Sequence, residues 1–268
     1  MSSIYPGRRR PLLFAHRGAS RLAPENTLEA FDLAVRLGVD VLEMDVHMTR
    51  DGQIVVVHDA ELSRTTDGHG LVCEHSYAEL QQLDAGARFL TAAGEPSFKG
   101  HGVVIPRLED VLGAFPKVGF NIEVKQFSEA MIPAVLRVLD SVGPSDVLLA
   151  AGEHPIMQQL EAAKPACPLG LSGAQAWKVF WTAFWGRIPE AWRGRALQVP
   201  SHHRGLPVLT KRTIARAHRA GLDVHLWTVN SLQEARHWLA LGVDGIMSDE
   251  PSAIEPAFYD ARAAAIFP

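Results

Sequence analysis

Short apolar runs recur along the chain, and polar segments with helical spacing separate most of them. Eight of these runs have the length and the composition of buried strands. In chain order they are residues 11–16, 41–46, 118–124, 146–151, 168–172, 196–200, 223–229 and 244–248. A further run, 53–59, follows the second strand after Arg50-Asp51-Gly52, and this turn sequence predicts an antiparallel hairpin.

Start and stop signals between the strands predict helices. Two helices are predicted to begin with a capping box and to end at a glycine: Asn26 with Glu29 and Gly38, and Ser231 with Glu234 and Gly242. Strands that alternate with helices are typical of parallel β–α units. Eight such units in 268 residues predict an α/β protein built on a (β/α)8 TIM barrel. An open doubly wound sheet is the alternative, but no glycine-rich phosphate loop follows the first strand.

One long stretch interrupts the alternation of strands and helices. Residues 60 to about 105 contain no clear strand–helix unit, so we expect an insertion after the second barrel strand. Within it, the segment from Tyr77 to Leu83 is predicted to be helical. The whole chain, 1–268, is predicted to be a single barrel domain that carries this insertion.

Composition narrows the class of protein. Hydrophobic residues make up 47% of the chain, which is enough for a sizeable core, and the net charge of -4 gives no basis for nucleic-acid binding. The N-terminus lacks the apolar region and cleavage site of a signal peptide, and no apolar run approaches the ~18 residues of a transmembrane helix. The two cysteines are expected to be reduced thiols, so we expect a cytoplasmic protein.

The segment 176–194 is unusually aromatic, because it holds four of the six tryptophans. One interpretation is an amphipathic helix packed on the barrel, since aromatic residues at helical spacing are most often part of a core. The other is an apolar lip that meets a lysophospholipid or a membrane surface. The sequence leaves both open.

Acidic residues interrupt two of the predicted strands. Glu43 and Asp45 share one face of the second strand, because side chains two apart on a strand point to the same side. Glu123 and Lys125 share a face of the next barrel strand. At the carboxyl ends of barrel strands the three carboxylates can converge, and they are expected to hold one divalent cation, Mg²⁺ or Ca²⁺. The alternative is that Lys125 or Arg17 neutralises the acids in salt bridges.

Two histidines lie at the ends of strands beside this acidic cluster. His16 ends the first strand, and His58 ends the second strand of the hairpin. Two such histidines fit a general acid and a general base. Arg17 suits a phosphate oxygen through its planar guanidinium, and Gly18 lets the chain turn close to a ligand.

The motifs as a set resemble one known family. In order along the chain they read HRGAS, APENTLEAF, GVDVLEMDVHMTRDGQIVVVHD, LSRTTDGHG, LQQLDAG, IPRLEDVL, NIEVK, WTVN and GVDGIMSDEP. Together they are similar to the glycerophosphodiester phosphodiesterase family from about residue 11 to 252, with the weakest match at about 155 to 210. The resemblance implies a TIM barrel with an insertion. It also implies hydrolysis of a small glycerophosphodiester to an alcohol and glycerol 3-phosphate.

Position by position, the resemblance also implies roles. The metal ligands are Glu43, Asp45 and Glu123, the catalytic pair is His16 and His58, the phosphate contacts are Arg17 and Lys125, and Trp227 flanks the substrate. The assignment of acid and base between the histidines stays open, as does the nucleophile, either a glycerol hydroxyl or water. The rivals are lysophospholipase D activity on the same site, a non-catalytic binding barrel, and metal-dependent enolisation.

Overall fold

The computed structural model describes residues 4–185, 187–203 and 206–264. Parallel strands form a curled sheet at its centre, in the order β5 (Val147–Ala150), β4 (Gly119–Val124), β2 (Val41–Met48), β1 (Leu12–Ala15), β10 (Gly245–Ser248), β9 (Asp223–Trp227) and β6 (Ala196–Pro200). The segment 168–172 joins the two ends of this sheet, because Leu169 bridges to Leu149 of β5 and Gly170 bridges to Ala196 of β6. The ring of parallel segments is thereby closed, which confirms the predicted barrel.

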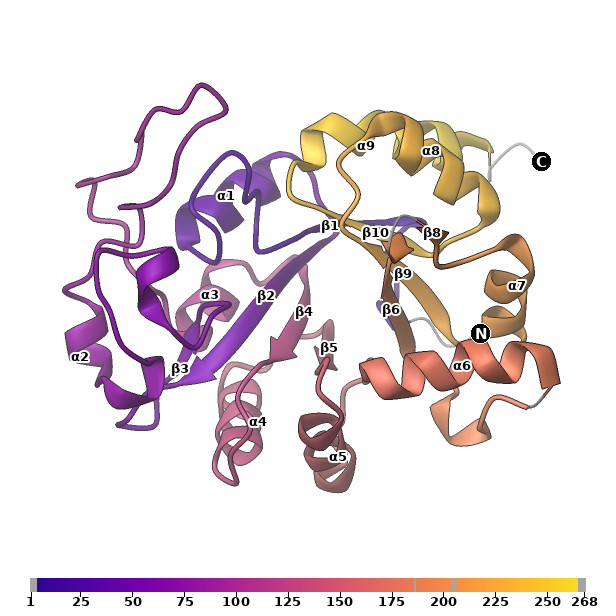
Figure 1. Ribbon diagram of the computed structural model, residues 1–268, viewed down its shortest axis with the longest axis horizontal. Helices are drawn as coiled ribbons and strands as arrows, with labels where there is room; N and C mark the ends of the chain where they lie inside the picture. The colour runs from indigo at the N-terminus through magenta and orange to yellow at the C-terminus, as the bar shows by residue number, and fades with distance from the viewer. Residues whose placement is uncertain (1–3, 186, 204–205, 265–268) are drawn as a thin grey trace.

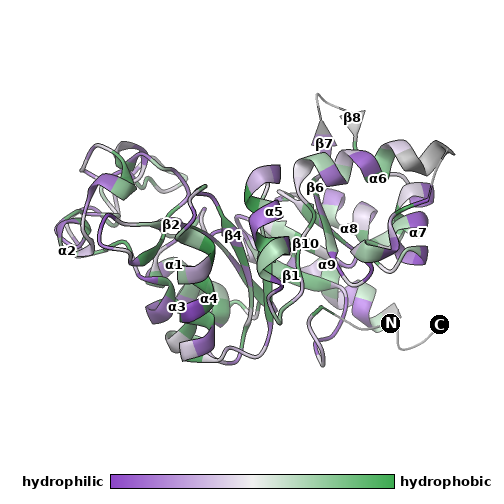
Figure 2. Cartoon of the chain, turned by 90° about the horizontal axis from the view of Figure 1, so that it is seen from below, coloured by the Kyte–Doolittle hydropathy of each residue, from purple (hydrophilic) through white to green (hydrophobic). Residues whose placement is uncertain are grey.

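Helices alternate with these strands and lie outside the sheet (Figure 1). They are α1 (Leu28–Arg36), α3 (Leu108–Ala114), α4 (Met131–Val142), α5 (His154–Ala163), α6 (Gly173–Trp185), α7 (Lys211–Arg219), α8 (Leu232–Leu241) and α9 (Pro251–Ala264). The short 3₁₀ turn η3 (Glu190–Trp192) precedes β6, and the strand pair β7 (His202–His203) and β8 (Leu206–Pro207) follows it. Figure 2 shows hydrophobic strands at the centre and helices of mixed hydropathy around them.

Alternation along the strands divides the core into two layers. Leu13 packs in the large cluster between sheet and helices, which includes Phe31 and Ala34 of α1. Its neighbours Leu12 and Phe14 belong to a second cluster, which fills the inside of the barrel. That inner cluster is Ile4, Tyr5, Leu12, Phe14, Val41, Leu148, Ala150, Ala196 and Met247. The amino-terminal half of the barrel interior is therefore mostly apolar and filled with side chains.

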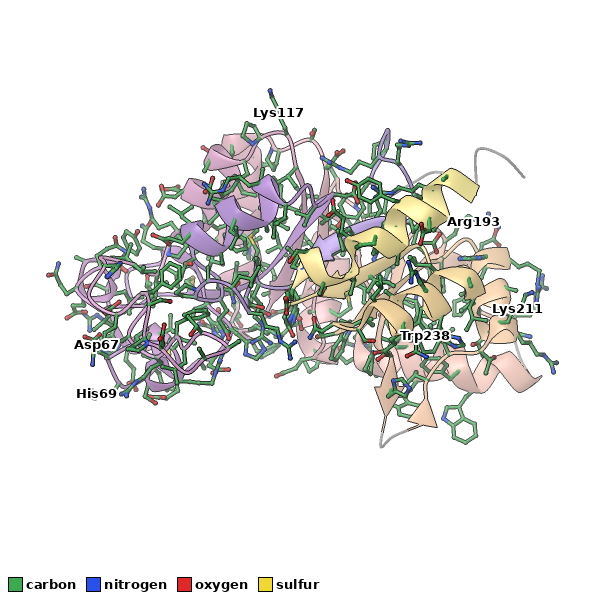
Figure 3. The ribbon with its side chains drawn as sticks, turned by 90° about the horizontal axis from the view of Figure 1, so that it is seen from above. Asp67, His69, Lys117, Arg193, Lys211 and Trp238 are labelled. Atoms are coloured by element: carbon green, nitrogen blue, oxygen red, sulfur yellow. The ribbon has the colours of Figure 1, made fainter. Side chains whose placement is uncertain are left out.

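The predicted hairpin and insertion are both present. β3 (Ile54–Val56) pairs antiparallel with β2, with Val56 opposite Val46. The insertion follows it and contains the 3₁₀ turns η1 (Leu62–Arg64) and η2 (Val72–Glu74) and the short helix α2 (Tyr77–Leu80). It has its own cluster of buried residues: Val55, Val57, Leu62, Val72, Leu80, Ala85, Val103 and Ile105. Asp67 and His69 mark its far end, opposite Arg193 and Lys211 on the other side of the molecule (Figure 3).

One predicted helix cap is wrong by a residue. Thr27, not Asn26, caps α1, because its hydroxyl accepts a hydrogen bond from the Ala30 amide. Asn26 has a φ of 59° and its side chain bonds Asp45 instead. Asn and Thr are both good N-caps, so local spacing alone did not separate them. The Ser231 cap of α8 is confirmed.

The aromatic segment forms most of α6, a helix that packs on the barrel with one face, and the choice between the two interpretations stays open. Ala176 and Val179 are buried against the barrel. Trp177 and Trp181 lie one turn apart on the opposite face and are 55% and 71% exposed. Gly186 of this segment lies outside the described residues. Among the described residues, each helix is too short or too polar to span a lipid bilayer.

Candidate active site

Three carboxylates meet at the carboxyl ends of β2 and β4. The two strands are neighbours, and their register sets Asp45 directly beside Glu123. With Glu43, two residues earlier on the same face of β2, they place one oxygen each within 4.8 Å of one another. Glu43 and Asp45 are only 3% and 1% exposed. The acids lie just beyond the apolar filling of the barrel, so its interior changes from hydrophobic to acidic along the strands.

Burial and mutual repulsion perturb this cluster. Burial, followed by the charge of Asp45, raises the pKa of Glu43 to about 8. The His16 charge and a hydrogen bond from the Arg17 amide to Glu43 Oε2, at 2.9 Å, act in the opposite direction. A positive charge placed among these oxygens would therefore be strongly favoured.

Two cations already touch part of the cluster. Lys125 Nζ lies 3.2 Å from Asp45 Oδ1 and 3.0 Å from Glu123 Oε2, and Arg17 Nε lies 3.3 Å from Asp45 Oδ2. The salt bridges predicted as the alternative to a metal thus exist. Among the described residues, however, no lysine or arginine pairs with Glu43, whose nearest cationic group is His16 Nε2 at 4.0 Å. Among the described residues, these salt bridges leave Glu43 without a lysine or arginine partner. A set of carboxylate oxygens fits a hard divalent cation.

A left-handed turn after β1 presents Arg17 to the acids. Arg17 has a φ of 55° and Gly18 a φ of 81°. Gly18 lies so close to α1 that an added Cβ would be 2.7 Å from the Cβ of Ala30. The close neighbour of Gly18 is therefore α1, and its predicted approach to a ligand stays a prediction. The same turn directs the Arg17 amide at Glu43 and its guanidinium at Asp45 and Glu25.

His16 is held by an acid from the last barrel strand. Its Nδ1 lies 2.7 Å from Asp249 Oδ1, directly after β10. Asp249 also accepts hydrogen bonds from Asn230 Nδ2 at 2.8 Å and from Ser20 Oγ at 3.2 Å. Burial alone would lower the pKa of His16, but the Asp249 hydrogen bond and the charge of Glu43 outweigh it and raise that pKa. The other ring nitrogen, Nε2, is left on the side of the acidic cluster.

His58 reaches the same rim through the hairpin. The Val57 amide donates to the Asp45 carbonyl at 2.9 Å, which sets the next residue beside the cluster. His58 Nδ1 lies 2.6 Å from Asp59 Oδ1, so each of the two predicted histidines has its own carboxylate. Arg64 binds both Asp59 and Glu25, and Glu25 in turn binds Arg17. A chain of ion pairs therefore connects the surroundings of His58 with the acidic cluster.

Trp227 lies at the carboxyl end of β9, on the same rim of the barrel, and is 40% exposed. Its carbonyl accepts a hydrogen bond from the Ser201 amide. Within the described part of the chain, no ion pair or ring contact joins its indole to the predicted site residues. The structure thus brings seven of the eight predicted residues into one network and leaves the indole on the rim beside it.

Several residues of this network were not predicted. Asn26 Nδ2 donates to Asp45 Oδ2 at 3.1 Å, a role hidden by its resemblance to a helix cap. Asp249 could have been found, because it directly follows a predicted barrel strand and such positions face the site. Glu25 lies in the loop before α1 and Arg64 ends the 3₁₀ turn η1. Neither position has a periodic signal, so only the fold brings the two side chains together.

Comparison with known proteins decides the family. The model of the glycerophosphoryl diester phosphodiesterase family matches residues 16–253. The chain belongs to this family. Membership confirms the predicted phosphodiester hydrolase, and it removes the basis for a non-catalytic binding barrel or an enolising enzyme.

Relatives of this phosphodiesterase span nearly its full length. YhdW of Bacillus subtilis (strain 168) is 35% identical over 247 residues, which cover 90% of this chain and 96% of the relative. Human lysophospholipase D GDPD1 is 25% identical over 272 residues, covering 93% and 86%. A solved phosphodiesterase of Oleispira antarctica, in complex with the product sn-glycerol-3-phosphate, is 30% identical with a TM-score of 0.73 and covers 92% and 96% of the two chains.

Proposed function

We propose that this phosphodiesterase hydrolyses glycerophosphodiesters to an alcohol and glycerol 3-phosphate. Glu43, Asp45 and Glu123 would hold one divalent cation, and His16 and His58 would move the protons. The observation that carries the proposal is the meeting of three carboxylates with two histidines, each backed by its own acid, on one rim of the barrel. The product bound to the Oleispira antarctica relative supports the same substrate class.

The oxygen-only donor set suits Mg²⁺ or Ca²⁺, both of which take carboxylate ligands. Bound there, such an ion would polarise a phosphate oxygen and lower the pKa of a neighbouring hydroxyl. The positive charge of the ion would stabilise the ionised form of Glu43, whose pKa is raised by burial. We therefore expect metal binding to displace a proton from the Glu43 carboxyl.

Arg17 and Lys125 supply charge for the phosphoryl oxygens. Arg17 Nε is buried and makes no hydrogen bond in the described structure, although Asp45 lies 3.3 Å away. A buried donor without an acceptor is costly, so a phosphate oxygen at this point would be favoured. Lys125 Nζ lies between Asp45 and Glu123 and can contribute a second positive charge.

The two histidines are suited to opposite proton transfers. One takes the proton of the attacking glycerol hydroxyl or water, and the other protonates the leaving alcohol. Asp249 fixes the His16 ring through Nδ1 and leaves Nε2 for the transfer, as Asp59 does for His58. Trp227, exposed on the same rim, would flank the bound diester.

Replacing Asp249 with asparagine should show which transfer His16 performs. The variant keeps a hydrogen-bond acceptor near Nδ1 but loses the negative charge, so the pKa of His16 should fall. One limb of the pH profile of kcat should move to lower pH. Movement of the alkaline limb assigns His16 as the acid, because an acid must stay protonated, and movement of the acidic limb assigns it as the base.

The matched control for this measurement is Asp260→Asn, which changes an exposed acid on α9 that is paired with Arg236. Its pH profile should coincide with that of the parent enzyme. If the Asp249→Asn variant also kept both limbs in place while folding normally, His16 would have no part in proton transfer.

A second candidate, lysophospholipase D activity, is favoured by one observation. Trp177 and Trp181 form an exposed aromatic pair on α6, of the kind that meets lipid at membrane interfaces. The human relative named lysophospholipase D supports the same chemistry on a lipid. The acyl chain of a lysophospholipid would then lie against this pair.

Competing substrates separate the two candidates. The proposed function predicts a higher kcat/KM for glycerophosphocholine than for lysophosphatidylcholine, measured side by side below the micelle concentration. A preference for the lipid of more than about tenfold, or ~1.4 kcal/mol in transition-state binding, would decide for lysophospholipase D. In that case Trp177→Ala with Trp181→Ala should reduce the lipid activity alone.

A further inference from the structure

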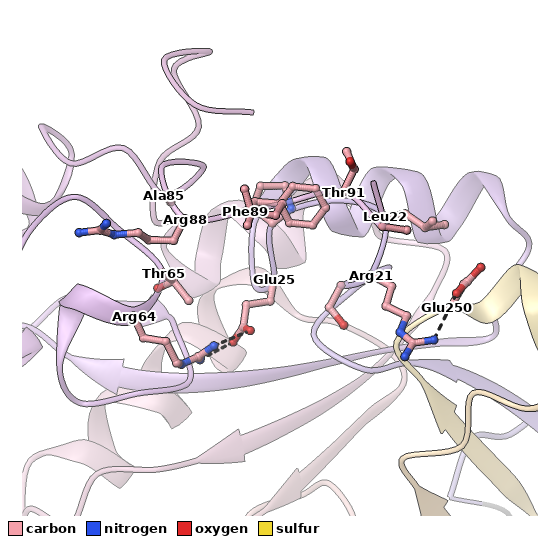
Figure 4. Close-up of a pocket in the computed structure, with 14 residues that line it drawn as sticks. Arg21, Leu22, Glu25, Arg64, Thr65, Ala85, Arg88, Phe89, Thr91 and Glu250 are labelled. Carbon is pink, nitrogen blue, oxygen red and sulfur yellow. Dashed lines mark hydrogen bonds and ion pairs between the residues drawn. The ribbon is translucent and has the colours of Figure 1, made fainter. Parts of the chain in front are cut away.

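A groove of about 690 Å³ opens between the loop after β1 and the insertion. In Figure 4, Arg64, Glu25, Arg21 and Glu250 lie along one side of the groove, and Phe89, Thr91 and Leu22 lie along the other. Arg88 Nε donates to the Thr66 carbonyl at 3.2 Å, which ties the outer segment to the rest of the insertion. None of the proposed metal ligands lines this groove.

The groove is connected to one of the two histidines. A neighbouring pocket of about 340 Å³ is lined by His16, Arg17 and Asp249 and shares Ser20, Arg21 and Glu25 with the groove. A molecule whose phosphate lies at Arg17 can therefore extend past His16 into the groove. If a glycerol hydroxyl attacks the phosphate, the glycerol lies toward the carboxylates that would hold the cation, so the portion in the groove is the other alcohol.

Polar and apolar surfaces face each other across this space. On the polar side, Arg64 binds Glu25 through two bonds of 2.7 and 2.8 Å, and Arg21 lies 3.6 Å from Glu250 (Figure 4). The apolar side includes Leu22, which is 38% exposed, and Phe89, whose ring packs edge-on against Phe98. Hydrogen-bond donors and acceptors thus alternate along one wall, and the other wall is mostly carbon surface.

We propose that this groove binds the alcohol portion of the diester and selects a polyol, of the glycerol or inositol class. The inference rests on the proposed hydrolysis of glycerophosphodiesters. Hydroxyl groups both donate and accept, so a polyol can bond the guanidinium and the carboxylate of each ion pair. The C–H face of the polyol packs against the apolar side chains of Phe89 and Leu22 on the opposite wall.

A quaternary ammonium group is disfavoured at the same place. It has no donor for Glu25 or Glu250 and no acceptor for the arginines. Three arginines and two glutamates line the groove, so its formal charge is positive and repels a cation. An alcohol portion that carries no further hydroxyl groups would displace water from the polar wall. It would offer the arginines and glutamates no hydrogen bonds in return.

Selectivity among soluble diesters tests the assignment. The wild-type enzyme should show a kcat/KM about tenfold higher for glycerophosphoinositol and glycerophosphoglycerol than for glycerophosphocholine, because hydrogen bonds to charged groups are the strong ones. Arg21→Gln removes a charged donor from the polar wall and should bring this ratio to within about twofold of one. The Arg21 side chain is 58% exposed, so the substitution should leave the thermal unfolding midpoint unchanged.

Arg36→Gln is the matched control, because Arg36 is an exposed arginine on α1 that pairs with Asp32 and does not line the groove. It should keep the wild-type ratio. Phe89→Leu keeps apolar volume but loses the ring. Like Arg21→Gln, it should lower kcat/KM for the polyol diesters relative to glycerophosphocholine. If wild type and both groove variants share one ratio, the groove assignment is overturned and the proposed function stands. If no glycerophosphodiester is hydrolysed at all, the proposed function fails and the groove assignment falls with it.

Discussion

Replacing His16 or His58 with alanine is expected to lower kcat by roughly 10²–10⁴-fold, the usual contribution of a positioned acid or base. Each ring has one nitrogen held by a carboxylate, Asp249 or Asp59, and the other makes no hydrogen bond to a described residue, which leaves it for proton transfer. Alanine removes the transferring atom but leaves the acidic cluster in place. The loss should therefore appear in kcat, measured under saturating substrate, rather than in substrate affinity.

His69→Ala is the control for these two variants, since His69 is exposed at the far end of the insertion (Figure 3). It should keep full activity. Thermal unfolding of all three variants distinguishes a catalytic from a structural role. A lowered unfolding midpoint with normal turnover at a temperature where the protein is folded would show that the histidines only support the fold.

Removal of divalent ions is expected to abolish activity. After treatment with EDTA and its removal, turnover should be undetectable, and Mg²⁺ or Ca²⁺ should restore it. Below pH 8 the ion must displace the proton that the raised pKa keeps on Glu43, so its affinity should rise with pH up to about 8. Titration calorimetry in two buffers with different ionisation enthalpies measures both the affinity and the released proton.

Variants of the acids complete this test. Glu43→Gln and Asp45→Asn should each lose the rise in unfolding temperature that the ion gives the parent enzyme. Asp140→Asn, a change at an exposed acid on α4, should retain it. Full turnover in thoroughly metal-free enzyme would contradict the metal assignment and would leave the salt bridges of Lys125 and Arg17 as the purpose of the cluster.

The barrel was predictable because its signals are local. Each strand is an apolar run of a few residues, and each helix has its own start or stop. Glu43 and Asp45 stood out for a related reason: acids on one face of a buried strand need partners, and alternation shows that they share a side. Even the segment 168–172, which forms only two bridges, was recognisable from its apolar run.

What the sequence did not reveal depends on contacts between distant segments. Glu25 and Arg64 are 39 positions apart, and nothing near either of them indicates the other. Asn26 was assigned to a helix cap because its neighbourhood fits that role, while its actual partner Asp45 is 19 positions away. The groove likewise needs two loops to face each other across space, which no periodicity describes.

The packed interior of the barrel determines where substrate and products can enter and leave the site. Tyr5 and Phe14, both fully buried, belong to this filling and occupy the amino-terminal half of the barrel. In the described part of the structure this filling closes that half, so substrate and products would enter and leave by the carboxyl-terminal rim. Glycerol 3-phosphate would occupy the same opening that the next diester needs, so the enzyme would be slowed by its own product as that product accumulates.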